Sequence, residues 1–87
     1  MSGEILLDVS DLPPPEPMER ILTALESLSP GDWLCVLIHR QPWPLLPELE
    51  ALGYAWRMQD RDPPGFEILI WRAGDADADT GANARAR

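Results

Sequence analysis

The feature that most constrains the fold is a run of six consecutive apolar residues, WLCVLI, at Trp33–Ile38. An apolar side chain at every position is typical of a central strand that is covered on both faces. Residues 4–9 (EILLDV) and 66–71 (FEILIW) are also short apolar runs and predict two more strands. Residues 54–59 alternate between large and small or polar side chains, which predicts a fourth strand.

Two helices are expected between these strands. In the first, large apolar residues recur at steps of three and four, with Pro17 suited to its first turn and Pro30-Gly31 ending it. Residues 45–52 predict a shorter second helix that Gly53 closes. The apolar stripe of the first helix consists of Met18, Ile21, Leu22, Leu25 and Leu28.

The expected order is therefore β-α-β-α-β-β. A β-α-β unit with parallel strands is right-handed, so both helices should cover the same face of the sheet. The sequence predicts a two-layer α/β sandwich, a four-stranded mixed sheet with two helices on one face, over residues 1–73. Residues 74–87 (GDADADTGANARAR) contain no large apolar residue, so we expect an acidic, Ala-rich, disordered tail.

Charge and composition restrict the function. Fifteen acidic residues against seven basic ones give a net charge of −8, which disfavours nucleic acid as a partner. No apolar run is long enough for a membrane span, and no signal-peptide pattern is seen at the start. The single Cys excludes an internal disulfide and a Cys-rich zinc site. We expect a cytoplasmic protein without a metal or a cofactor.

The segment after the first strand carries a family resemblance. Leu7-Asp8, Leu12 and Pro15-Glu16-Pro17 resemble the signature of the TusA/SirA sulfur carriers, in which a strand ending in Leu-Asp is followed by Gly-Leu-x-Cys-Pro-x-Pro and a helix. The order of elements agrees over roughly residues 4–72. The resemblance implies the carrier fold.

A second resemblance is to an uncharacterised bacterial family of short chains. That family carries LPPPEPxxRIL, then a His-x-x-Pro-x-Pro-Leu stretch, then a Gly-Trp/Phe-Glu strand. The residues that match its second and third segments are His39, Pro42, Pro44, Leu45, Gly65, Phe66 and Glu67.

One departure from the carrier signature decides the chemistry. The position of the sulfur-carrying Cys is Pro14, and the Gly before it is Asp11. A proline cannot hold a persulfide, so transfer by the carrier mechanism is excluded there. Cys35, the remaining thiol, is either a small apolar residue of the central strand or a relocated carrier or redox residue; we favour the first interpretation.

A candidate ligand site lies where the first two strands end. Parallel strands end at the same edge, and both helices begin there, so helix dipoles and free N–H groups converge on it. His39 and Arg40 follow the central strand, and Asp8 and Glu16 could lie nearby. These residues could bind a small anion or act as an acid/base pair; alternatively, His39 only anchors a loop.

A candidate interface lies on the other face of the sheet. Two helices on one face cannot cover the second apolar face of the central strand. Trp33, Leu37 and Trp71 would then form an exposed apolar patch, which a homodimer or a protein partner would cover.

The leading hypothesis is a non-catalytic accessory or binding module that docks a partner protein or holds a small anion. The alternative is a small enzyme or carrier in sulfur or nitrogen-oxide metabolism that uses His39 with a nearby carboxylate; that metabolic setting is implied only by the resemblance. A weaker option is a transcription-linked regulator, and the acidic charge argues against direct contact with DNA.

Overall fold

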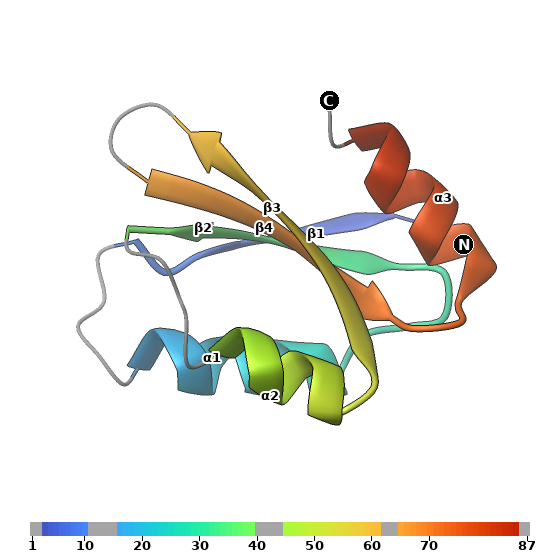
Figure 1. Ribbon diagram of the computed structural model, residues 1–87, viewed down its shortest axis with the longest axis horizontal. Coiled ribbons are helices and arrows are strands. Elements are labelled where there is room, and N and C mark those ends of the chain that lie inside the picture. Colours follow the sequence, from blue (N-terminus) through green and yellow to red (C-terminus); the bar gives the residue numbers. More distant parts are fainter. Residues whose placement is uncertain (1–2, 11–15, 40–44, 62–64, 86–87) are drawn as a thin grey trace.

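The computed structural model describes residues 3–10, 16–39, 45–61 and 65–85 (Figure 1). The order of the first six elements is the one predicted, and the central strand has the predicted bounds. A third helix follows them. The elements are β1 Glu4–Asp8, α1 Glu16–Glu26, β2 Trp33–Ile38, α2 Leu45–Ala51, β3 Tyr54–Arg61, β4 Gly65–Arg72 and α3 Ala76–Arg85.

The four strands form one mixed sheet in the order β1-β2-β4-β3. β1 runs parallel to β2, as predicted, and β4 is antiparallel to both β2 and β3. The apolar strand β2 therefore lies inside the sheet, next to β4, while β1 and β3 form its two edges. Leu6 at the middle of β1 lies opposite Cys35 of β2.

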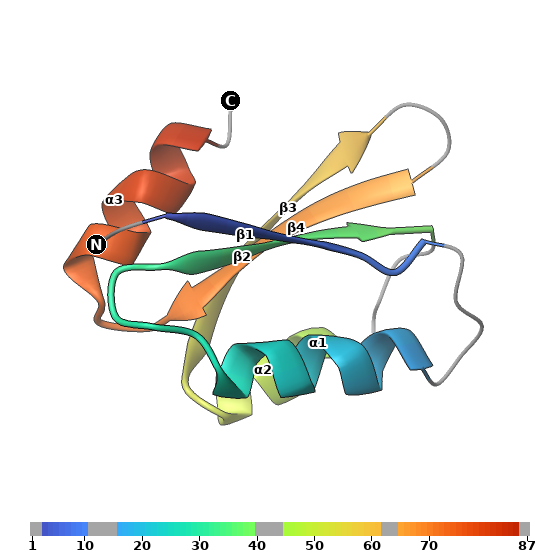
Figure 2. The same cartoon turned by 180° about the vertical axis from the view of Figure 1, so that it is seen from behind.

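Helices α1 and α2 cover one face of the sheet together, as the right-handed connection requires (Figures 1 and 2). Their apolar stripes meet β2 and β4 in a core of large aliphatic side chains. The predicted alternation in β3 is confirmed, because Tyr54, Trp56 and Met58 pack against this core. The buried members are Val9, Ile21, Leu25, Leu28, Leu34, Val36, Ile38, Leu45, Leu46, Leu49, Ile68 and Ile70.

The predicted end of α2 at Gly53 is supported by the backbone, whereas α1 already ends at Glu26, so Pro30-Gly31 forms the turn before β2 and not the end of the helix. Gly31 and Gly53 have φ of 87° and 92°, a left-handed conformation that glycine adopts without steric cost. The amide of Gly53 donates to the carbonyl of Glu50, which closes the last turn of α2. No helix in the described part of the chain is long and apolar enough to cross a membrane.

The end of the chain differs from the sequence-based expectation. Instead of a disordered tail, the structure has α3 at Ala76–Arg85, lying against the face of the sheet opposite α1 and α2 (Figures 1 and 2). Ala78 and Ala82, one helical turn apart, are fully buried against Cys35, Leu69 and Trp71. Their small side chains let the helix backbone approach the sheet closely, a mode of packing that a search for large apolar residues overlooks.

Candidate functional site

The ends of β1 and β2 lie next to each other at one edge of the sheet, where the ligand site was predicted. The amide of Val9 donates to the carbonyl of Leu37 at 2.9 Å, which ties the end of β1 to the end of β2. Asp8 and the exposed His39 are thereby brought to the same edge. Asp8 Oδ1 accepts bonds from the Ser10 amide at 3.0 Å and from the Ser10 hydroxyl at 2.6 Å. This carboxylate oxygen therefore supports the turn after β1.

The other two predicted ligand residues cannot be placed in the same way. Arg40 lies outside the described residues, and of Glu16 only the backbone is described, as the first residue of α1. A cluster of three or more metal-ligating side chains is not found among the residues that the structure describes. Anion binding at this edge stays a prediction.

The predicted apolar interface is covered over part of its area. Trp71 is only 5% exposed because α3 lies over it, whereas Trp33 and Leu37 are partly buried at its margin. The expectation that this face would be bare was wrong at Trp71, since it assumed that residues 74–87 contribute no structure. Within the described residues, the Trp71 indole N–H has no hydrogen-bond partner.

Helix α3 is attached at its start by Asp75. One carboxylate oxygen of Asp75 accepts a bond from the Gly31 amide at 2.7 Å, and the other accepts one from the Ala78 amide at 3.2 Å. The second bond is an N-cap, and the first joins the helix to the turn before β2. The amides of Gly31 and then Ala78 lower the pKa of Asp75.

The middle of α3 fits closely against Trp33. A Cβ atom built on Gly81 would collide with the Trp33 ring, so only glycine allows this contact. On the side facing β3, the Arg57 guanidinium donates to the Asn83 side chain at 2.8 Å.

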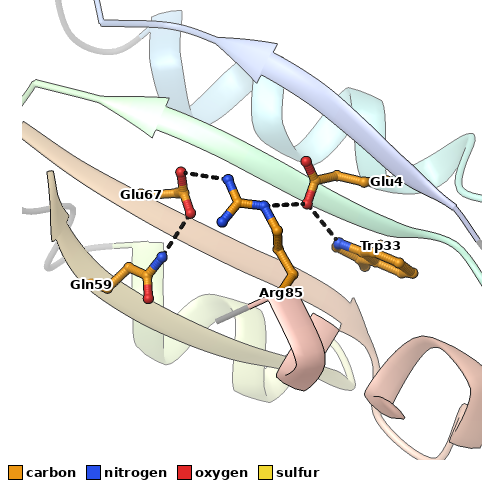
Figure 3. A network of polar contacts seen from close by, with 5 residues as sticks. All are labelled: Glu4, Trp33, Gln59, Glu67 and Arg85. Carbon is orange, nitrogen blue, oxygen red and sulfur yellow. Dashed lines mark hydrogen bonds and ion pairs between the residues drawn. The ribbon is translucent and has the colours of Figure 1, made fainter. Parts of the chain in front are cut away.

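A polar network holds the end of α3 (Figure 3). Arg85 pairs with Glu67 at 3.1 Å and with Glu4 at 3.2 Å, so a single guanidinium joins β4 to the edge strand β1. Gln59 donates to Glu67 at 2.8 Å, and the Trp33 indole donates to Glu4 at 3.1 Å. The two carboxylates, Glu67 first, raise the pKa of Arg85. Glu67 is only 6% exposed, so burying its side chain would be costly without these partners.

Cys35 lies beneath this network. The thiol is fully buried, and this burial, together with the negative charge of Glu67, raises its pKa to about 12. A thiol with so high a pKa and no exposed surface is a poor nucleophile. The interpretation of Cys35 as a core residue is confirmed.

Sequence reasoning did not find the network itself. Glu67 was matched only as part of a family pattern, although a charge inside the apolar run FEILIW is a signal that a partner is needed. Arg85 carried no such signal, because it lies 18 residues further along the chain, in the segment expected to be disordered.

One edge of the sheet is apolar and uncovered. Leu6 and Ile5 of β1 are 62% and 43% exposed, and with Leu52 they make up the large apolar side chains that are exposed among the described residues. Two of the three therefore lie at consecutive positions of one edge strand, with their side chains on opposite faces of the sheet. An exposed edge strand that carries large apolar side chains is a site at which another chain can pair.

The architecture is thus a small α/β sandwich whose single thiol is buried. Residues 6–72 match the family described as uncharacterized conserved protein (DUF2249), and the chain belongs to that family. The match ends at the last residue of β4, so α3 lies outside it. No curated protein and no solved structure gave a significant match to the chain. The kinship with the sulfur carriers stays a prediction.

Proposed function

We propose that the protein is a non-catalytic binding module that docks a partner protein. The observation that carries this proposal is the edge strand β1, which exposes 62% of Leu6 and 43% of Ile5 to solvent. Leaving adjacent leucine and isoleucine side chains in water has a free-energy cost that a bound partner would remove.

The state of the thiol supports a role without covalent chemistry. Carrier and redox cysteines need a thiolate that their partners can reach, whereas Cys35 is buried and has a pKa of about 12. The acid/base alternative built on His39 has less support. Asp8, the carboxylate at the same edge, already accepts two bonds from Ser10.

Affinity enrichment from the cells that make the protein tests this proposal. Three baits are compared: the wild type, Leu6→Ser and Leu52→Ser. Leu52 is the matched control, because it is 57% exposed but lies in the turn after α2, away from β1. We expect at least one protein to be retained by the wild type and by Leu52→Ser and lost with Leu6→Ser. Identical enrichment by all three baits would contradict docking through β1.

A further inference from the structure

The outer side of β1 is an open strand edge. The carbonyl of Gly3 and the amide of Val9 both bond to β2. Backbone groups of successive residues point to opposite sides of a strand, so the even-numbered Glu4 and Leu6 direct their N–H and C=O groups away from the sheet. Figure 2 shows β1 in front of the sheet, with no described helix or strand over its outer side.

The side chains of β1 offer apolar surface on both sides of this edge. Leu6 lies opposite Cys35 and so shares the face that carries α3, whereas Ile5 lies opposite Leu34 and shares the face of α1 and α2. A strand added at this edge would therefore bury apolar side chains at consecutive positions. Pairing of this kind draws affinity from main-chain hydrogen bonds and specificity from alternate side chains.

The opposite edge of the sheet lacks these features. β3 (YAWRMQDR) carries charged residues, of which Arg57 is exposed and bonded to Asn83 of α3. None of the large exposed apolar side chains in the described residues lies on it. Charges on an edge strand oppose pairing with another chain, and β1 has none between Glu4 and Asp8.

The charges around β1 select the occupant. A second copy, paired through a two-fold axis at Leu6, would place Glu4, which also pairs with Arg85, directly opposite Asp8, and two carboxylates in that position repel one another. Two molecules of net charge −8 would also repel one another. A segment with basic residues on either side of a short apolar stretch has the complementary charge.

We propose that the free edge of β1 binds an extended segment of a partner protein, apolar at its centre and flanked by Lys or Arg, as an added fifth strand. This proposal rests on the proposed function and defines the partner's chemistry. β1 has five residues, so the paired stretch of the partner spans about 17 Å at roughly 3.3 Å per residue.

The probe is a nine-residue synthetic peptide with a threonine-valine-leucine-valine-threonine centre and two arginines on each side, titrated into the full chain and followed by NMR. We expect amide shifts centred on Glu4 and Leu6. Leu6→Lys should weaken binding about tenfold, because it replaces the apolar contact by a like charge. Leu52→Lys is the matched control and should bind as the wild type does. Melting temperatures confirm that both variants fold.

Two control peptides separate the contribution of charge to binding from that of strand pairing. Replacing the arginines by glutamates should abolish binding if charge selects the segment, and replacing the central leucine by proline should abolish it if a strand ladder forms. Binding that both control peptides reproduce, or that Leu6→Lys leaves unchanged, would overturn the proposal. So would Leu6 shifts that grow with protein concentration alone, which would identify a second copy as the occupant.

The outcome also distinguishes this inference from the function on which it rests. If the arginine peptide does not bind but a cellular partner is lost with Leu6→Ser, strand addition is wrong and docking through β1 stands. If the peptide does not bind and all three baits enrich the same proteins, both proposals fail.

Discussion

The two faces of the sheet are packed by different means. On the face of α1 and α2, large aliphatic side chains from both helices meet those of β2 and β4. On the face of α3, the helix contributes only Ala78 and Ala82 to the buried cluster. It also packs against Trp33 at Gly81 and is attached by polar contacts at its two ends. The comparison teaches that one face is stabilised mainly by buried area, and the other by close fit and a few specific bonds.

This difference in packing predicts that α3 is held on the sheet less strongly than α1 and α2 are. Burying large aliphatic side chains stabilises by about 1.5–3 kcal/mol each, whereas a buried Ala contributes much less. The unpartnered indole N–H of Trp71 further opposes packing on the α3 face. We expect α3 to detach from the sheet before the rest of the fold opens.

The largest effect should come from the aliphatic face. Leu25→Ala removes a side chain that is 1% exposed and leaves a cavity, so we expect the free energy of unfolding to fall by about 2–5 kcal/mol. Urea denaturation measures this change. The control, Leu52→Ala, alters a side chain that is 57% exposed and should cost less than about 0.5 kcal/mol. Equal losses in the two variants would contradict the assignment of Leu25 to the core.

A smaller and local effect is expected from Gly81→Ala, because the added Cβ would collide with the Trp33 ring. Displacing α3 should cost about 1–2 kcal/mol, partly offset by the higher helix propensity of Ala. The readout is the rate at which iodoacetamide modifies Cys35. This rate should rise when α3 detaches, while amide-exchange protection in α1 stays unchanged.

The control for this variant is Thr80→Ala, an exposed position in the same helix, which should leave the Cys35 labelling rate at the wild-type value. A labelling rate that Gly81→Ala does not change would mean that α3 does not limit access to the thiol. The expectation that α3 detaches from the sheet before the rest of the fold opens would then be wrong.

Next in size is Arg85→Ala, which removes the guanidinium shared by Glu4 and Glu67. The Arg85 side chain is 42% exposed, so solvent screens these pairs, and we expect a loss of about 1 kcal/mol that shrinks as salt is added. Thermal melts at low and high ionic strength measure it.

Arg20→Ala is the matched control for Arg85, since Arg20 is an exposed arginine of α1 and its loss should be nearly neutral. Glu67→Gln should reduce the effect of Arg85→Ala, because the double variant leaves no unpaired carboxylate at the buried position 67, and only the exposed Glu4 loses its partner. Additive losses in the double variant would show that the two residues do not act together.

The smallest expected effect is a pH dependence at Asp75. The folded-state pKa is lowered, so the stabilisation by this residue is complete above its unfolded-state pKa of about 3.9 and is lost as pH falls through the folded-state pKa. NMR signals of α3 should therefore change in acid before those of α1. In Asp75→Asn, which keeps an acceptor oxygen but no charge, this part of the pH dependence should vanish.

The same difference in packing explains why the α1 and α2 face could be predicted from the sequence and the α3 face could not. The stripe Ile21, Leu25 and Leu28 and the doubly apolar β2 carry strong periodic signals, so the sandwich and the parallel pairing of β1 with β2 could be predicted. The meeting of Asp8 and His39 at one edge followed from that topology. The α3 face gave no such signal, because Ala and Gly contribute little to a hydropathy pattern. Their contribution here is that their small size lets the backbone of α3 approach the sheet closely.

The sequence by itself determined the order of the first six elements, the covered face of α1 and α2 and the burial of Cys35, because local periodicity and run length decide which side chains must leave water. Only the tertiary structure decided that β1 is an edge with Leu6 exposed, and that Glu4, Glu67 and Arg85 meet. Those contacts join residues far apart along the chain, and a pairing over such distances depends on which strands become neighbours in the sheet, a choice that no local pattern encodes.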